Sequence, residues 1–245
     1  MQLACLDLEG VLVPEIWIEF SKRTNIPELS RTTRDEPDYD RLMQGRLAIL
    51  AQHRLGLPDI QKVIAEMGPL PGARAFLDWL RERFQVVILS DTFYEFAMPL
   101  MQQLGYPALL CHKLEVDAGG VVRNYVLRQP EAKRESVKAF RALNFKTIAA
   151  GDSYNDTAML AEADAGILFR PPQNVIDEFP QYPVTRSYEE LAAAFEAAGR
   201  RIQTTSRPGA GFFGLLGGNH FLAISSSFVA LISWPSRPAS FAEPP

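Results

Sequence analysis

Cysteine is scarce in this sequence, which contains only Cys5 and Cys111 among its 245 residues. Two cysteines cannot form the disulfide framework of a small secreted protein, so a reducing compartment is expected. The N-terminus also lacks a basic stretch followed by an apolar run and a small-residue cleavage site, the pattern of a secretory signal. We therefore expect a cytoplasmic protein.

An excess of positive charge is missing as well, because the formal net charge is -4 at pH 7. Without a general basic field, a nucleic-acid partner is not expected. The three histidines, His53, His112 and His220, are too scattered to have metal-ligand spacing, which argues against a zinc site. The sequence has no glycine-rich loop ending in Lys and Ser or Thr, so direct use of ATP is not expected.

Charged residues are absent from one long stretch near the C-terminus, residues 209–234. About 20 apolar residues can span a bilayer, but this stretch also contains five glycines, three consecutive serines, Asn219 and His220. These residues argue against a membrane helix, and membrane contact through 209–234 is not expected. We interpret residues 206–245 as an apolar C-terminal extension that is poorly ordered.

Elsewhere, short apolar runs alternate with stretches of helical periodicity. The expected strands cover residues 3–9, 86–90, 147–153 and 165–169, and a hairpin is expected around the turn at 118–120. The expected helices cover residues 15–24, 38–55, 58–67, 72–84, 93–104, 133–143, 155–163 and 187–202. Strands that are almost wholly apolar are typical of a parallel sheet with helices on both faces. The predicted fold class is therefore α/β, with a Rossmann-like parallel sheet core.

The segment between the first two expected strands is too long for a single crossover. Its middle, residues 15–67, has only helical patterns. We interpret 15–67 as a small helical cap that is inserted into an α/β core, and the core as residues 1–14 and 68–202.

Polar residues follow the expected strands at the edge where open α/β sheets form their sites. Asp7 and Glu9 end the first strand, Ser90 and Asp91 end the second, and Asp152, Asn155 and Asp156 follow the third. Lys133 begins a helix just before the third strand. Each cluster alone is more typical of a helix cap or a turn. Lys133, Arg134 and Lys138 are alternative candidates for a catalytic cation, and any of them could lie on a solvated helix face.

The order of the motifs DLEG, LSDT, a lysine and GDSYND resembles that of the haloacid dehalogenase-like (HAD-like) phosphohydrolases over most of the first 200 residues or so. The resemblance implies a HAD-like fold, an aspartyl-phosphate intermediate and Mg²⁺ as cofactor. Asp7 would be the nucleophile, which splits one difficult displacement into two easier ones. Asp7, the backbone carbonyl of Glu9 and Asp152 would supply the oxygen ligands that Mg²⁺ prefers.

The resemblance also implies roles for the other motif residues. Glu9 would protonate the leaving oxygen and later deprotonate water, although it could instead be a carboxylate that only stabilises a nearby helix. Ala132-Lys133 fits the family pattern best, so Lys133 would neutralise phosphate charge. Ser90 would donate a hydrogen bond to a phosphoryl oxygen, and Asp156 would orient Lys133 or a metal-bound water from the second shell.

The cap contains one arginine at an unusual position. On a helix over 38–55, at about 100° per residue from Leu42, Arg46 falls at about 40° and Ile49 at about -20°, within the apolar face. Arg46 either extends outward along its stem or points at an anion inside. Glu15, at the start of the first cap helix, either complements the helix dipole or binds an ammonium group.

An acid and an arginine above a phosphoryl site suit an amino acid phosphate, and they resemble the phosphoserine phosphatase branch of the family. DLEGVLVPEIW, VVILSDTFYEF, LLCHKLE and AAGDSYNDTAML are similar to the bifunctional phosphoserine phosphatase/phosphoserine:homoserine phosphotransferase group, which shares Glu9 and Asp91. That likeness implies serine and threonine biosynthesis, with phosphoserine and homoserine as substrates. The substrate-binding residues would be Glu15, Arg46, Ser90, Asp91, Lys133 and Asn155. The likeness to this group is also compatible with a homodimer.

Two alternatives remain open. A related phosphatase for another small phosphorylated metabolite would have the same motifs, because the substrate assignment depends on two side chains. A phospho-accepting receiver domain also uses a strand-end aspartate, Mg²⁺, a hydroxyl residue and a lysine. Receivers are shorter and lack a helical cap, so the enzyme is favoured.

Overall fold

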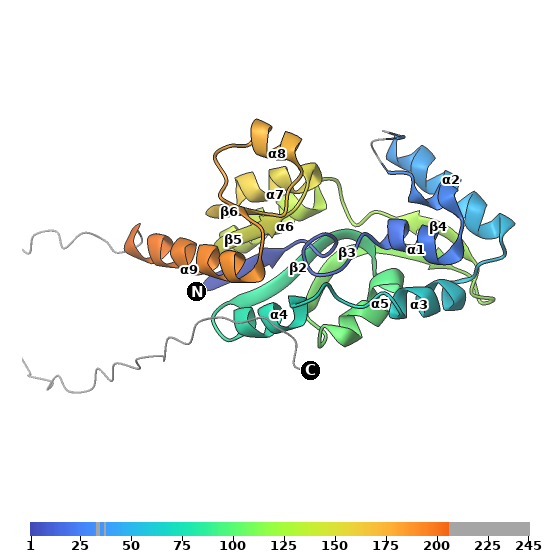
Figure 1. The fold of residues 1–245 in the computed structure, drawn as a ribbon, viewed down its shortest axis with the longest axis horizontal. Coiled ribbons are helices and arrows are strands. Elements are labelled where there is room, and N and C mark those ends of the chain that lie inside the picture. Colours follow the sequence, from blue (N-terminus) through green and yellow to red (C-terminus); the bar gives the residue numbers. More distant parts are fainter. Residues whose placement is uncertain (33–34, 37, 206–245) are drawn as a thin grey trace, which may run out of the picture.

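The computed structural model describes residues 1–32, 35, 36 and 38–205, which form a seven-stranded sheet with helices on both faces (Figure 1). The strands are β1 (Gln2–Leu6), β2 (Gln85–Phe93), β3 (Ala108–Val116), β4 (Val122–Val126), β5 (Lys146–Gly151), β6 (Ala165–Phe169) and β7 (Val184–Thr185). Their spatial order is β4-β3-β2-β1-β5-β6-β7. Neighbouring strands are parallel except β3 and β4, the expected hairpin, which pair antiparallel. The predicted α/β class is confirmed.

The helices follow the predicted pattern, with ends shifted by a few residues. They are α1 (Ile16–Thr24), α2 (Tyr39–Gln52), α3 (Leu57–Ala65), α4 (Ala73–Arg81), α5 (Tyr94–Gln103), α6 (Ala132–Ala142), α7 (Thr157–Glu162), α8 (Gln173–Glu178) and α9 (Tyr188–Thr205), with 3₁₀ turns η1 (Pro27–Ser30) and η2 (Tyr154–Asp156). The sequence analysis missed α8, β7 and η1. Elements of two to six residues are too short to show a hydrophobic period.

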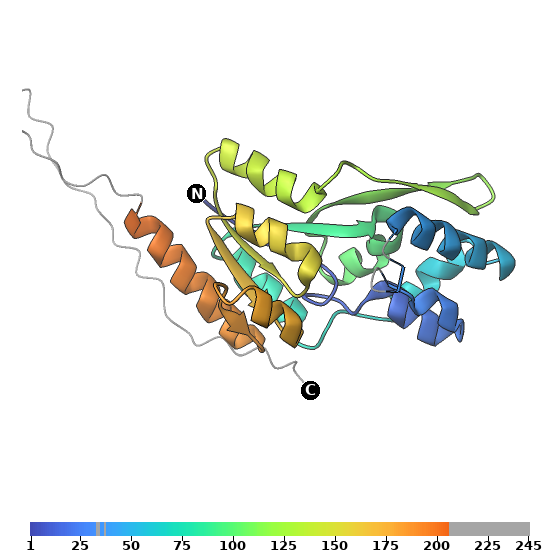
Figure 2. The same ribbon diagram turned by 90° about the horizontal axis from the view of Figure 1, so that it is seen from above.

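Successive side chains of the central strand β1 point to opposite faces of the sheet, and each face has its own apolar core. Leu3 and Cys5 of β1 lie in a cluster with residues of α6, α7 and α8, whereas Ala4 and Leu6 lie in a cluster with residues of α4, α5 and α9. Figure 1 shows α6, α7 and α8 above the sheet and α4 and α5 below it, and Figure 2 looks down on the side covered by α6, α7 and α8. Because both faces are covered, the parallel strands are apolar nearly throughout.

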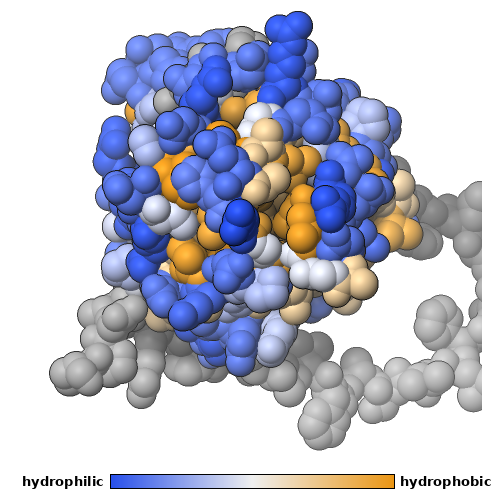
Figure 3. All heavy atoms as spheres, turned by 90° about the vertical axis from the view of Figure 1, so that its right-hand side faces the viewer, coloured by the Kyte–Doolittle hydropathy of each residue, from blue (hydrophilic) through white to orange (hydrophobic). Residues whose placement is uncertain are grey.

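Helices α1, α2 and α3 lie at one end of the molecule, away from α9 (Figure 1). The β3–β4 hairpin and α5 hold them there: Leu57 N–H donates to Gly120 O at 2.7 Å, and the Tyr125 hydroxyl donates to Asp40 at 2.7 Å. Figure 3 views this end and shows hydrophobic residues gathered between hydrophilic ones. Beneath this surface, the buried cluster that contains Ala4 and Leu6 also includes residues of α1–α3 and of α5.

The C-terminal ends of three strands differ from the predictions. β5 ends at Gly151, two residues before the predicted Ser153. β1 ends at Leu6, so Asp7 and Glu9 lie in the turn that follows it. β2 continues to Phe93, so the prediction that it ends at Ser90 was wrong. A register shift between Leu89 and Phe93 lets pairing with β3 resume beyond the polar Ser-Asp-Thr sequence.

No helix within the described residues is both long and apolar enough to cross a membrane. The predictions for 206–245, including the stretch 209–234, fall outside the residues that the structure describes.

Candidate active site

A tight turn after β1 positions Asp7, which is buried at the carboxyl edge of the sheet. Its backbone N–H donates to Ala150 O of β5 at 2.9 Å. Gly10 has φ of 74°, and a Cβ there would overlap the Asp152 carboxylate. Only glycine combines this backbone angle with so close an approach, so the turn brings the ends of β1 and β5 together.

Lys133 lies in the first turn of α6 and is buried among carboxylates. Its Nζ is 2.9 Å from Asp7 Oδ1, 2.8 Å from Asp156 Oδ1 and 3.2 Å from Asp91 Oδ2. Burial disfavours the charged ammonium, but these carboxylates outweigh it and raise the pKa of Lys133 well above its usual value. Lys133 therefore stays protonated and carries the positive charge of the site.

The two alternative cations lie elsewhere. Arg134 pairs with Glu131 at 3.0 Å and with Glu162 at 3.4 Å, and Lys138 pairs with Glu135 at 3.5 Å on the exposed side of α6. Exposed ion pairs of this kind contribute little to folding stability. Of the three candidates, Lys133 is the one that contacts Asp7.

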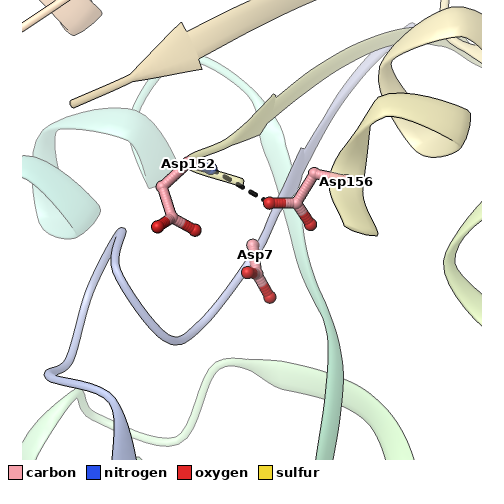
Figure 4. Close-up of side chains that lie close together, drawn as sticks. All are labelled: Asp7, Asp152 and Asp156. Atoms are coloured by element: carbon pink, nitrogen blue, oxygen red, sulfur yellow. Dashed lines mark hydrogen bonds between the residues drawn. The ribbon is translucent and has the colours of Figure 1, made fainter. Parts of the chain in front are cut away.

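Asp7, Asp152 and Asp156 form an acidic cluster whose nearest oxygens lie within 4.8 Å of one another (Figure 4). Burial, with the Asp156 charge next, raises the pKa of Asp152 to about 7. Burial and the Asp156 charge also raise the pKa of Asp7 well above its usual value, against the opposing effect of Lys133. Crowded buried carboxylates favour a cation among them.

The oxygens of this cluster are not equivalent. Asp156 Oδ1 contacts Lys133, and its Oδ2 accepts from the backbone N–H groups of Asp152 at 3.0 Å and Ser153 at 3.2 Å. Asp152 Oδ1 is buried and, within the described part of the chain, has no hydrogen-bond partner. An orphaned carboxylate oxygen beside Asp7, in an all-oxygen donor set, fits Mg²⁺. The saturated Asp156 is suited to orienting Lys133.

Glu9 lies half-buried in the same turn and joins it to α1. Its Oε1 accepts from the backbone N–H of Ile16, the first residue of α1, at 2.8 Å. Burial and the nearby Glu15 charge raise the pKa of Glu9 to about 8, although the Ile16 N–H and Lys133 oppose the rise. Glu9 thus stabilises the helix start, as one interpretation of the sequence has it, and its raised pKa also suits a proton donor at neutral pH.

Asp91 lies beside Lys133, with Ser90 next to it in β2 and Asn155 bonded to it. The Ser90 hydroxyl is buried and accepts from the Thr92 backbone N–H at 3.2 Å. Asn155 Nδ2 donates to Asp91 Oδ2 at 3.0 Å. Burial would raise the pKa of Asp91, but the Lys133 charge and hydrogen bonds hold it below its usual value. Asp91 is therefore an ionised carboxylate at the wall of the site.

Arg46 points inward from α2, with only 8% of its surface exposed. Its guanidinium lies 4.4 Å from the ring centre of Trp17, and Nη2 donates to Arg31 O at 2.7 Å. Its Nε is buried and has no hydrogen-bond partner among the residues that the structure describes. Burial lowers the pKa of Arg46 to about 10, so it remains charged at neutral pH. A buried guanidinium with an unused donor is suited to an anionic group.

Glu15 is exposed at the start of α1, and its charge affects the pKa values of Glu9, Asp152 and Arg46. Tyr39 is a residue near Asp91 that the sequence analysis did not place at the site. Burial and the Asp91 charge raise the pKa of its hydroxyl. An aromatic residue at a helix start carries no signal that would have identified it. The structure thus brings the predicted motif residues together near Lys133, with Glu15 at the start of α1 and Arg46 in α2.

Comparisons with known proteins agree with this geometry. A family model for haloacid dehalogenase-like hydrolases matches residues 1–164. The phosphoserine phosphatase ThrH of Pseudomonas aeruginosa is 64% identical over 201 residues, 82% of this chain and 98% of that protein. A phosphoserine phosphatase of Pseudomonas syringae pv. tomato is 62% identical over 201 residues, 82% of this chain and 85% of that protein. A solved phospho-aspartyl intermediate analogue of phosphoserine phosphatase, 18% identical, aligns with a TM-score of 0.64 over 79% of this chain and 98% of that chain, which shows a shared fold.

Proposed function

This chain belongs to the haloacid dehalogenase-like hydrolases, and from that premise we propose that it is a Mg²⁺-dependent phosphoserine phosphatase. It hydrolyses O-phosphoserine to serine and phosphate through an aspartyl-phosphate on Asp7. The observation that carries the proposal is the contact of the buried Asp7 with Lys133, at 2.9 Å, beside the orphaned oxygen of Asp152. The phosphoserine phosphatase names of the relatives at 64% and 62% identity support the substrate.

Asp7 and Glu9 perform the chemistry in this proposal. An Asp7 oxygen attacks phosphorus and the bond from phosphorus to the serine oxygen breaks, while Glu9 gives its proton to that oxygen. Glu9 then takes a proton from water, whose oxygen attacks the aspartyl-phosphate, so that phosphate leaves and Asp7 is restored. The raised pKa of Glu9, about 8, keeps its proton available for the first step at neutral pH.

Lys133 and Ser90 stabilise the charge that develops on the phosphoryl oxygens. Asp7, Asp152 and the Glu9 carbonyl would hold Mg²⁺, which supplies further positive charge at those oxygens. Asp156 orients Lys133, since their contact is 2.8 Å.

The substrate's amino acid part is bound by the cap. Arg46 takes the carboxylate through its unused donor, and Glu15 takes the ammonium group. Asn155 and Asp91 complete the wall beside the phosphoryl group. In this scheme residues 15–67 are the helical cap that selects the substrate, and residues 1–14 and 68–202 are the core that carries the reaction.

Homoserine can replace water in the second step. Its hydroxyl then attacks the aspartyl-phosphate, Glu9 takes the hydroxyl proton, and phosphohomoserine leaves. The likeness of Glu9 and Asp91 to the bifunctional group supports this transferase activity, and with it roles in serine and threonine biosynthesis in the cytoplasm. The alternative is a phosphatase for another small phosphorylated metabolite, which the same core would serve.

Phosphate release from O-phosphoserine, with Mg²⁺ present, tests the hydrolytic proposal. The wild-type protein should release phosphate, and Asp7→Asn should not, because an amide oxygen is a poor nucleophile. Asp177→Asn is the matched control, since Asp177 lies exposed on α8, away from the site, and accepts a hydrogen bond from Gln173 of the same helix. Turnover of Asp7→Asn at the rate of this control would refute the mechanism. Faster release from a different phosphate ester would support the alternative substrate.

A further inference from the structure

His112 is a buried polar residue next to the proposed site that the mechanism above does not use. It lies in β3 opposite Phe93 of β2, and 5% of its surface is exposed. Its Nδ1 accepts the backbone N–H of Arg128 at 3.0 Å. Since the accepting nitrogen of an imidazole carries no proton, this bond assigns the proton to Nε2. His112 therefore presents an N–H donor on its other side.

That donor faces Asp91. Nε2 of His112 lies 3.8 Å from Asp91 Oδ1, whereas Asp91 Oδ2 contacts Lys133 at 3.2 Å and Asn155 at 3.0 Å. The two oxygens of the carboxylate thus face different partners. The distance of 3.8 Å exceeds a hydrogen bond, and a small turn of the Asp91 side chain would close it.

Lys133 divides its charge among three carboxylates, and a phosphoryl group would compete for it. The Asp91 contact is the longest of the three, and the Asp91 side chain is the most exposed, at 40%. Asp91 is therefore the partner that Lys133 most easily exchanges for a phosphoryl oxygen. Once it loses this cation, the Asp91 carboxylate needs another donor to keep it in place near an anion.

We propose that His112 is a positioning residue whose Nε2–H holds the Asp91 carboxylate while Lys133 binds the phosphoryl group. The proposal rests on the proposed function, since it presupposes a phosphoryl ligand at Lys133.

Arg128 links both parts of the arrangement. Its backbone N–H orients His112, and its guanidinium Nη2 donates to Ala132 O at 2.9 Å and to the Ser136 hydroxyl at 2.7 Å. Ala132 precedes Lys133 at the start of α6. The segment between β4 and α6 therefore fixes the ring of His112 and the helix turn that carries Lys133.

Two variants separate the two nitrogens of His112. In His112→Gln the amide nitrogen can reach the position of Nε2 and donate to Asp91. In His112→Asn the amide oxygen can replace Nδ1 as the acceptor for Arg128, but no donor reaches Asp91. Loss of one hydrogen bond to a charged group corresponds to a change of roughly tenfold at the lower end of its range. We expect kcat for O-phosphoserine to fall roughly tenfold in His112→Asn and to stay within about threefold of wild type in His112→Gln.

A double-mutant cycle tests whether the effect passes through Asp91. In the Asp91→Asn background, His112→Asn should cause no further loss of kcat. Equal losses of kcat in His112→Asn and His112→Gln, with parallel losses of Tm, would mean that His112 is only structural. Losses that multiply in the double variant would also overturn the proposal.

NMR spectroscopy of the full chain provides a readout that needs no turnover. Addition of Mg²⁺ and beryllium fluoride, a phosphoryl mimic, should shift the His112 Nε2–H proton downfield in the wild type and not in Asp91→Asn. No shift in the wild type would refute the proposal. If the wild-type protein hydrolyses no phosphoserine, the proposed function fails, and this NMR shift still decides whether His112 engages Asp91.

Discussion

Replacement of Arg46 by alanine should separate phosphate esters that carry a carboxylate from those that do not. Arg46 is 8% exposed, and its Nε is buried with no hydrogen-bond partner among the described residues. A substrate carboxylate that accepts from this donor would gain a charge-assisted hydrogen bond of about 1.5 to 3 kcal/mol. For O-phosphoserine, kcat/KM should therefore fall roughly 10- to 150-fold in Arg46→Ala.

The assay compares O-phosphoserine with O-phosphoethanolamine, which has the ammonium and phosphate groups but no carboxylate. For O-phosphoethanolamine, kcat/KM should change by less than about threefold. Arg46→Lys should show an intermediate loss, because lysine keeps the charge but not the planar fork. Arg41→Ala is the matched control, since Arg41 lies on the same helix with 77% of its side chain exposed. Equal losses for both substrates would refute the assignment of Arg46 to the carboxylate.

Three further predictions concern the core of the site. Lys133→Met should lower kcat roughly 100-fold or more in steady-state kinetics. The control Lys138→Met, which removes an exposed ion pair with Glu135, should retain the wild-type kcat. Equal kcat values in the two variants would contradict the role of Lys133. Gly10→Ala should abolish the Mg²⁺-induced rise in Tm, because the added Cβ would overlap the Asp152 carboxylate. The control Gly45→Ala should raise Tm, because Gly45 lies in α2 with open space around it. An unchanged Mg²⁺ response in Gly10→Ala would argue against Asp152 as a metal ligand. Finally, the pKa of Asp152, about 7 when folded, lies above its unfolded value of about 4. The metal-free folded protein then binds a proton that the unfolded chain has released, so this group destabilises the fold increasingly between about pH 4 and 7. Because Mg²⁺ needs the ionised carboxylate, the Mg²⁺-induced rise in Tm should grow from about pH 6 to about pH 8 in thermal melts; a rise that is constant with pH would contradict it.

Sequence periodicity predicted much of this architecture. Apolar runs identified β1, β5 and β6 because parallel strands covered on both faces have no solvated side. The helical wheel predicted that Arg46 lies within the apolar face of α2, and Arg46 is buried there. The motifs DLEG and GDSYND were expected at one sheet edge, and Asp7 and Asp152 lie together in the acidic cluster.

Other features depend on contacts between distant segments. The continuation of β2 through Ser90 and Asp91 requires pairing of Phe93 with His112 on β3, which no local pattern encodes. The bond from the Ile16 N–H to Glu9 joins residues seven positions apart across a turn. The position of His112 beside Asp91 likewise depends on strand register, and the histidine spacing in the sequence gives no sign of it.

The most direct test of the central claim is ³¹P NMR of the protein with Mg²⁺, O-phosphoserine and excess homoserine. The account predicts that phosphoserine is consumed, that inorganic phosphate and phosphohomoserine appear together, and that Asp7→Asn forms neither. Inorganic phosphate alone would remove the transferase activity and leave the phosphatase. No consumption of phosphoserine by the wild type, or equal consumption by Asp7→Asn, would contradict the account.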